Sequence, residues 1–157
     1  MKKVFLFVTL LAAIATQSLS AQESSKNQSG QLLSLYYDIK DALVSGNAAT
    51  ASAKAGDFVK AINSIDTKIV GEVSRDALLK DVTVISTSKD LKEQRVIFAP
   101  FSDNMIALAK TVKLSAEPVY LQYCPMKKAS WLSSQQAIKN PYYGSAMLTC
   151  GSVKATF

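Results

Sequence analysis

Apolar side chains follow the spacing of α-helices through the first two thirds of this chain. They recur every three or four positions, which places them on one face of a helix. The first stripe contains Leu32, Leu35, Tyr36, Ile39 and Leu43. The second contains Ala51, Ala55, Phe58, Ile62 and Ile65. Between the two stripes, Gly46 is typical of a helix C-terminus and Asn47 of a helix N-cap, so the short connection predicts an antiparallel helical hairpin.

Two further segments continue the helical pattern less regularly. Residues 71–87 begin with helical spacing at Val73, Ala77 and Leu78, and then become rich in β-branched residues at Val82, Val84 and Ile85. We predict a helix there, because a lone strand between helices would have no partner. The apolar residues of these segments are assigned to the core.

The last of these helices is expected to follow Ser88, which would serve as its N-cap. Its predicted inner face contains Leu91, Arg95, Phe98, Met105, Leu108 and Val112. Pro100 lies inside this pattern and should kink or split the helix, because proline has no backbone N–H to donate.

The pattern changes after Pro118. The segments "VYLQY" (119–123) and "SVKATF" (152–157) are short and β-prone, and they could pair as antiparallel edges around the loop 124–150. The predicted fold is therefore mainly α: an antiparallel three- to four-helix bundle with a small C-terminal β-hairpin and loop unit over residues 118–157. We expect residues 31–157 to form a single domain.

The first twenty residues have the pattern of an export signal. Two lysines are followed by the apolar run "VFLFVTLLAAIA" and then by small and polar residues. That run is shorter than the ~20 residues needed to cross a bilayer, so we expect cleavage, no stable membrane insertion, and a location most typical of the periplasm. Residues 21–30 contain no apolar anchor and are predicted to be a flexible leader.

Charge and composition exclude several functional classes. The formal net charge is +6, but the charges alternate in sign along the chain, which is typical of an ordinary solvated surface and not of a nucleic-acid binder. The chain has no histidine, which excludes Ser–His–Asp and Cys–His catalysis and imidazole zinc sites. No carboxylates are grouped as a catalytic pair, so we expect a non-enzymatic protein.

Both cysteines lie near the C-terminus, each close to a methionine. Cys124 and Met126 are two positions apart and would share one side of an extended backbone, whereas Met147 and Cys150 are three apart and would be neighbours on a tight turn. If the flanking strands pair, the four sulfur atoms can converge. Thiolate and thioether are soft donors that suit Cu(I) or Ag(I), so these four residues are the candidate metal ligands.

A structural role for the same residues is equally consistent with the pattern. Two cysteines in an exported protein usually form a disulfide. A bond between Cys124 and Cys150 would stabilise the fold by about 3–4 kcal/mol on chain-entropy grounds. Met126 and Met147 would then fill gaps in the core.

Three aromatic residues accompany the cysteines. Trp131, Tyr142 and Tyr143 could shield a metal site from water, or they could form a docking surface for a partner protein. The "NPYYG" motif, residues 140–144, also reads as a rigid turn in which Gly144 supplies a positive φ.

Three stretches of the chain resemble a known family. They are "LYYDIKDALVSGNAATASAKA", "EQRVIFAPFSDNM" and above all "VYLQYCPMKKASWLSSQQAIKNPYYGSAMLTCG", which together span about residues 32–153. They are similar to the bacterial domain-of-unknown-function family 3347, whose members resemble exported helical domains and domains attached to heavy-metal efflux adaptors. The resemblance implies copper or silver handling with Cys124, Met126, Met147 and Cys150 as the matching positions, and a metal-efflux adaptor or another periplasmic protein as the partner.

The chain departs from the family pattern beside the first cysteine. Tyr123 stands where many relatives have a histidine, which implies a weaker site, a purely sulfur-based one, or none. Two hypotheses therefore follow from the sequence: a soft-metal-binding domain, and a disulfide-stapled interaction domain without metal.

Overall fold

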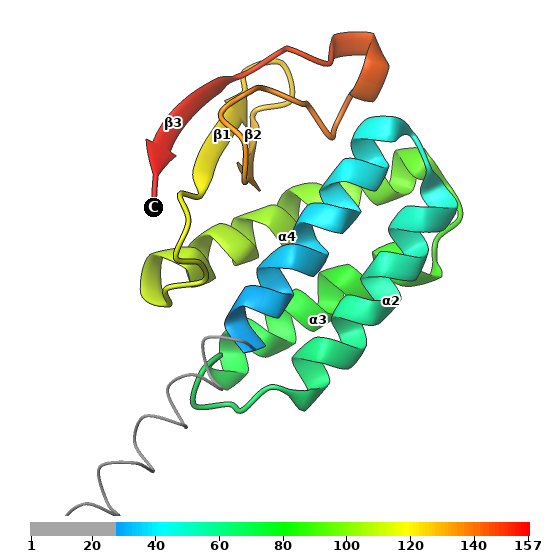
Figure 1. The fold of residues 1–157 in the computed structure, drawn as a ribbon. Coiled ribbons are helices and arrows are strands. Elements are labelled where there is room, and N and C mark those ends of the chain that lie inside the picture. The colour runs from blue at the N-terminus through cyan, green and yellow to red at the C-terminus, as the bar shows by residue number, and fades with distance from the viewer. Residues whose placement is uncertain (1–27) are drawn as a thin grey trace, which may run out of the picture.

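In this computed structural model, which describes residues 28–157, four α-helices precede a three-stranded antiparallel sheet (Figure 1). The first helix covers residues 28–45 of the described part and is the unlabelled blue helix of Figure 1. The others are α2 (Ala48–Ser64), α3 (Glu72–Thr87) and α4 (Leu91–Thr111). The predicted mainly α fold is confirmed, whereas the predicted export signal and most of the leader lie outside the described residues.

The first helix already includes the end of the predicted leader. Residues 28–30 are helical and Ser29 is buried, so the prediction of a flexible leader is wrong for these three positions.

The connection between the first two helices is as predicted. Gly46 has a φ of 75°, a left-handed conformation that favours glycine. The side chain of Asn47 then accepts a hydrogen bond from the Thr50 amide at 2.9 Å and so caps α2. This turn returns the chain and allows Ala51 and Ala55 to pack fully buried in the core.

The β-branched segment is helical, as predicted, and forms α3. Leu78, Val82 and Ile85 are fully buried along one face of this helix. Val73 is instead 86% exposed, so its assignment to the core is wrong. It precedes Leu78 by five positions, about 140° around the helix axis, and therefore points away from the buried face.

For α4, the predicted N-cap is wrong, and of the kink or split expected at Pro100 the split does not occur. The N-cap is Asp90, whose carboxylate accepts a hydrogen bond from the Lys92 amide at 2.8 Å, whereas the Ser88 hydroxyl accepts from the Asp90 amide at 3.1 Å. Pro100 does not split the helix, which runs through it without a break. Pro100 is exposed, so the carbonyl group that loses its intrahelical partner can be hydrated.

The C-terminal unit, residues 118–157, contains the sheet. Its strands are β1 (Tyr120–Cys124), β2 (Ala129–Ser133) and β3 (Ser152–Thr156), in the order β2-β1-β3. The predicted pairing of the segments that became β1 and β3 is confirmed, with Tyr123 opposite Ser152. Sequence patterns missed β2, which pairs with β1 through a hairpin that sets Cys124 opposite Ala129.

The sheet packs on one side of the helical bundle, against α4 (Figure 1). Trp131 and Leu132 of β2 are fully buried there. The Tyr36 hydroxyl joins the two parts, because it accepts a hydrogen bond from the Leu132 amide at 3.1 Å and lies 2.7 Å from the Ser102 hydroxyl. The sheet is thereby held in a fixed position on the bundle.

Candidate functional site

The fold brings the two cysteines together. Cys124 ends β1, and Cys150 lies two residues before β3, which pairs with β1. Their Sγ atoms are 3.5 Å apart and both thiols are free. Cys124 is fully buried, whereas Cys150 is partly exposed, so the pair is reached from the side of Cys150.

A tight turn between β1 and β2 surrounds the buried thiol with hydrogen-bond donors. The Lys128 amide donates to the Cys124 carbonyl at 2.8 Å, and Lys128 itself has a φ of 56°. This conformation directs the backbone amides of Lys127 and Met126 toward the sulfur of Cys124. Successive amide groups converging on one atom favour negative charge there.

Asn140 fixes the opposite side of the pair. Its side-chain amide donates to the Cys150 carbonyl at 2.8 Å, and its Oδ1 atom accepts from the Tyr142 amide at 2.9 Å. Asn140 is fully buried and also hydrogen-bonds the Cys124 sulfur. Sequence reasoning assigned Asn140 only to a turn, and the Asn-Pro dipeptide gave no sign of its contact with the cysteines.

The pKa values of the two thiols are shifted in opposite directions. Burial by itself raises the pKa of Cys124, but hydrogen bonds from the Lys127 amide, Cys150, Asn140 and the Met126 amide outweigh this and lower it below the ordinary cysteine value. The pKa of Cys150 is raised, because its thiol donates to Cys124, because it is desolvated, and because a neighbouring thiolate repels a second negative charge. The arrangement favours one thiolate, at Cys124, with a neutral thiol beside it.

The two methionines lie at the border of this pair. Met126 belongs to the turn above Cys124, and the carbonyl of Met147 accepts a hydrogen bond from the Cys150 amide at 3.1 Å. Their side chains are 63% and 40% exposed, so the expectation that they fill the core is wrong. Both are large apolar side chains left at the surface, within three positions of a cysteine in the sequence.

The three aromatic residues differ in exposure. Trp131 is fully buried and Tyr142 is 5% exposed, so neither can contribute to the expected docking surface; only Tyr143 is partly exposed. Trp131 instead packs against the backbone beside Cys150: a Cβ atom on Gly151, where φ is 152°, would lie 2.9 Å from its ring. Trp131 therefore covers the inner side of the site.

The donor set is sulfur alone. Within residues 28–157 no group of three or more histidine, cysteine, aspartate or glutamate side chains could hold a metal ion. Any metal site at this position would thus rest on two thiolates and neighbouring thioethers, a set that suits soft monovalent ions and not calcium or magnesium.

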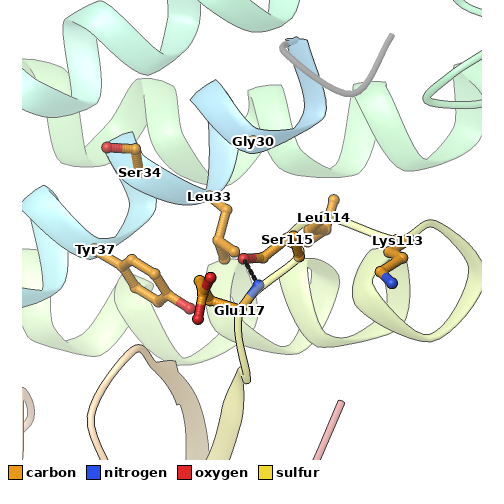
Figure 2. Close-up of a pocket in the computed structure, with 9 residues that line it drawn as sticks. Gly30, Leu33, Ser34, Tyr37, Lys113, Leu114, Ser115 and Glu117 are labelled. Carbon is orange, nitrogen blue, oxygen red and sulfur yellow. Dashed lines mark hydrogen bonds between the residues drawn. The ribbon is translucent and has the colours of Figure 1, made fainter. Parts of the chain in front are cut away.

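A separate hollow lies away from the cysteines, between the first helix and the segment that joins α4 to β1 (Figure 2). Its volume is about 470 Å³, and Leu33, Tyr37 and Leu114 form much of its wall. The Tyr37 hydroxyl has no hydrogen-bond partner in the described part of the chain, and burial raises the pKa of this phenol. The hollow contains no thiol and does not contact the sulfur site.

Comparison with known proteins identifies the family. A family described as "Protein of unknown function (DUF3347)" matches residues 32–117. The chain belongs to this family. The match covers the helical bundle and ends before β1, so the sulfur site lies beyond the matched residues.

No curated protein and no solved structure matches the chain significantly. Within residues 28–157, no helix combines the length and apolarity needed to span a membrane.

Proposed function

We propose that this protein is an exported, non-enzymatic domain that binds a soft monovalent metal ion, Cu(I) or Ag(I), in metal handling or efflux. The observation that carries the proposal is the pair of free thiols, with Sγ atoms 3.5 Å apart, where β1 ends and the chain approaches β3, with Cys150 partly exposed. Two thiolates this close together are a donor set that these ions prefer.

The electrostatics of the pair favour metal binding. A thiol must lose its proton to become a metal ligand. The lowered pKa of Cys124 supplies one thiolate, and the charge of a bound cation would offset the repulsion that raises the pKa of Cys150. Binding should therefore release a proton from Cys150.

The exposed methionines provide additional soft donors. Met126 follows Cys124 by two positions and Met147 precedes Cys150 by three, and a thioether keeps its affinity for a soft ion at any protonation state of its surroundings. Exposed side chains retain rotamer freedom, which would allow either methionine to approach a bound ion.

The competing hypothesis is a structural disulfide. A disulfide requires a sulfur–sulfur distance of about 2.05 Å, so the two sulfurs would have to approach each other from 3.5 Å. Oxidation and metal binding use the same thiolates and exclude each other. The part of this hypothesis that assigns Trp131 and Tyr142 to a docking surface for a partner is weakened, because both side chains are buried.

The test is a competition for Cu(I) between the reduced protein and a chromogenic chelator, with Ag(I) binding followed by native mass spectrometry. We expect one ion per chain. Cys124→Ser and Cys150→Ser should each abolish competition, and Met126→Leu and Met147→Leu should weaken it, because leucine keeps the volume but removes the donor. Thr149→Ser, an exposed change beside Cys150, is the matched control and should leave binding unchanged.

Thiol labelling of the unreduced protein separates the two hypotheses. Two reactive thiols with tight Cu(I) binding support the metal site. Blocked thiols without copper retention, or full copper affinity in Cys150→Ser, would overturn it.

A further inference from the structure

The surplus positive charge of the described residues lies entirely in the C-terminal unit. Residues 118–157 contain four lysines and neither aspartate nor glutamate. Residues 28–117, which contain the bundle, have eleven basic and eleven acidic residues and therefore no net charge. The alternation of charges expected from the sequence holds for the bundle but is wrong for the unit that carries the thiols.

A groove lies where this basic unit meets the start of α4. Its volume is about 500 Å³. Three cations line it: Lys92 and Arg95 from α4, and Lys127 from the turn above Cys124. Asp90 is the one acidic residue of its lining, and its carboxylate is occupied by the Lys92 amide as the cap of α4.

The wall of the groove is partly apolar. Val96 is 50% exposed and lies along the groove with Leu91 and the partly exposed Tyr143. Cations beside aliphatic and aromatic side chains suit a ligand that carries carboxylates next to apolar groups, and not a fully hydrated ion.

Among the described residues, Arg95 has no negatively charged partner in the groove. Its Nη2 atom donates to the Leu43 carbonyl at 2.8 Å, while its Nε atom has no hydrogen-bond partner within residues 28–157. No carboxylate in that range forms an ion pair with it, and burial lowers the pKa of Arg95. A partly buried guanidinium without a counter-charge is unfavourable, and a carboxylate brought by a partner would correct this.

The position of this guanidinium is fixed by the backbone around it. Gly144, with a φ of 54°, lies so close to Arg95 that a Cβ atom would clash with Nη2 and would be 2.8 Å from the Val44 carbonyl. The glycine of the "NPYYG" motif therefore makes room for Arg95, which is held in place before any ligand binds.

We propose that this groove binds an acidic segment of a partner protein, with its carboxylates beside Lys92, Arg95 and Lys127 and an apolar side chain against Val96 and Tyr143. Lys127 links the groove to the thiols, because its side chain lines the groove and its backbone amide hydrogen-bonds Cys124. A partner seated there would lie next to Met126 and the cysteine pair. Exchange of a metal ion between the partner and the cysteine pair rests on the proposed function. Docking of the partner in the groove does not depend on it.

The experiment measures the fluorescence anisotropy of a labelled short peptide of alternating glutamate and leucine against the full chain lacking its export signal. We expect saturable binding that weakens with added salt. Lys92→Glu and Lys127→Glu should each reduce affinity by about fivefold or more, since charge reversal replaces attraction with repulsion. Lys139→Glu is the matched control: it removes the same charge from the same unit, outside the groove, and should change affinity by less than about twofold.

Several results would overturn the docking site. They are equal binding of a glutamine–leucine peptide, equal weakening by Lys139→Glu, and binding only to vesicles that contain phosphatidylglycerol, which would indicate a membrane surface instead. Ag(I) binding is measured on the same variants. Cys150→Ser should lose Ag(I) and keep the peptide, whereas Lys92→Glu, on α4 and outside the thiol site, should weaken peptide binding and keep Ag(I), so a failure of one proposal is distinguishable from a failure of the other.

Discussion

The helical bundle and the C-terminal unit are stabilised in different ways. In the bundle, apolar stripes pack into an aromatic centre in which the Tyr36 and Phe98 rings stack with centroids 5.4 Å apart. In the unit, buried amide side chains bind loop carbonyls: the Gln122 side chain donates to the carbonyl of Gln135 at 2.8 Å, and Asn140 donates to that of Cys150. Helices satisfy most of their own backbone groups, whereas irregular segments need side-chain partners. In the bundle this need is confined to the helix ends, where the buried Gln94 side chain donates to the Ser88 carbonyl at 2.9 Å.

This difference explains where the chemistry lies. The helices of the bundle satisfy most of their own backbone hydrogen-bonding groups and carry balanced charge, so they offer few free amides to stabilise a reactive group. The irregular unit has free backbone amides, such as those of Met126 and Lys127, which stabilise a thiolate. The candidate site therefore lies on the part of the molecule with the less regular backbone.

The largest expected effect is in the bundle. Phe98→Ala would leave a cavity in the aromatic centre and should lower the free energy of unfolding by about 3–5 kcal/mol. Urea denaturation monitored by circular dichroism measures this. Val96→Ala, on the exposed side of the same helix, should cost less than about 0.5 kcal/mol. Similar losses for the two variants would contradict the packing described for α4.

The next effect tests the joint between the two parts. Tyr36→Phe leaves the Leu132 amide and the Ser102 hydroxyl without this partner in the interior, and should destabilise the protein by about 1–3 kcal/mol. Hydrogen exchange should show the largest loss of protection in β2. Uniform loss throughout the bundle with none in β2 would contradict a role for Tyr36 in holding the sheet.

A smaller effect is expected inside the unit. Asn140→Ala removes the hydrogen bonds to the Cys150 carbonyl and the Tyr142 amide, and should reduce stability by about 1–2 kcal/mol. It should also raise the pKa of Cys124, because one hydrogen bond to the thiolate is lost. Unfolding and pH-dependent alkylation of the same variant measure both changes, and Lys139→Ala at the preceding exposed position is the control. An unchanged Cys124 pKa would show that Asn140 does not stabilise the thiolate.

The smallest expected effect is the difference between the pKa values of the two thiols. Alkylation by iodoacetamide, followed by peptide mass spectrometry, should rise with pH at both positions, because the thiolate is the reactive form. The midpoint for Cys124 should lie below that of an ordinary cysteine and the midpoint for Cys150 above it. The Cys150→Ser variant has a single thiol, so alkylation should show one transition with pH, that of Cys124. Reversed midpoints in the parent protein would contradict the assigned thiolate.

Sequence patterns predicted the bundle better than the unit. The Gly46–Asn47 turn and the helix over 72–87 follow from local rules, because a helix is specified by residues three and four positions apart. The sequence predictions were wrong where contacts between residues distant in sequence determine the structure. Whether Val73 faces the core depends on which face of α3 is covered, and β2 exists because β1 lies beside "ASWLS" and pairs with it.

By itself, the sequence determined the helical stripes, the absence of histidine chemistry and the presence of soft sulfur donors in one terminal segment, because composition and periodicity are properties of the chain alone. Only the tertiary structure decided that Cys124 and Cys150 meet at 3.5 Å, that Trp131 and Tyr142 are interior, and that Arg95 faces the groove without an ion-pair partner in the described part of the chain. These facts depend on contacts between residues distant in sequence, and burial, acidity and access are set by those contacts.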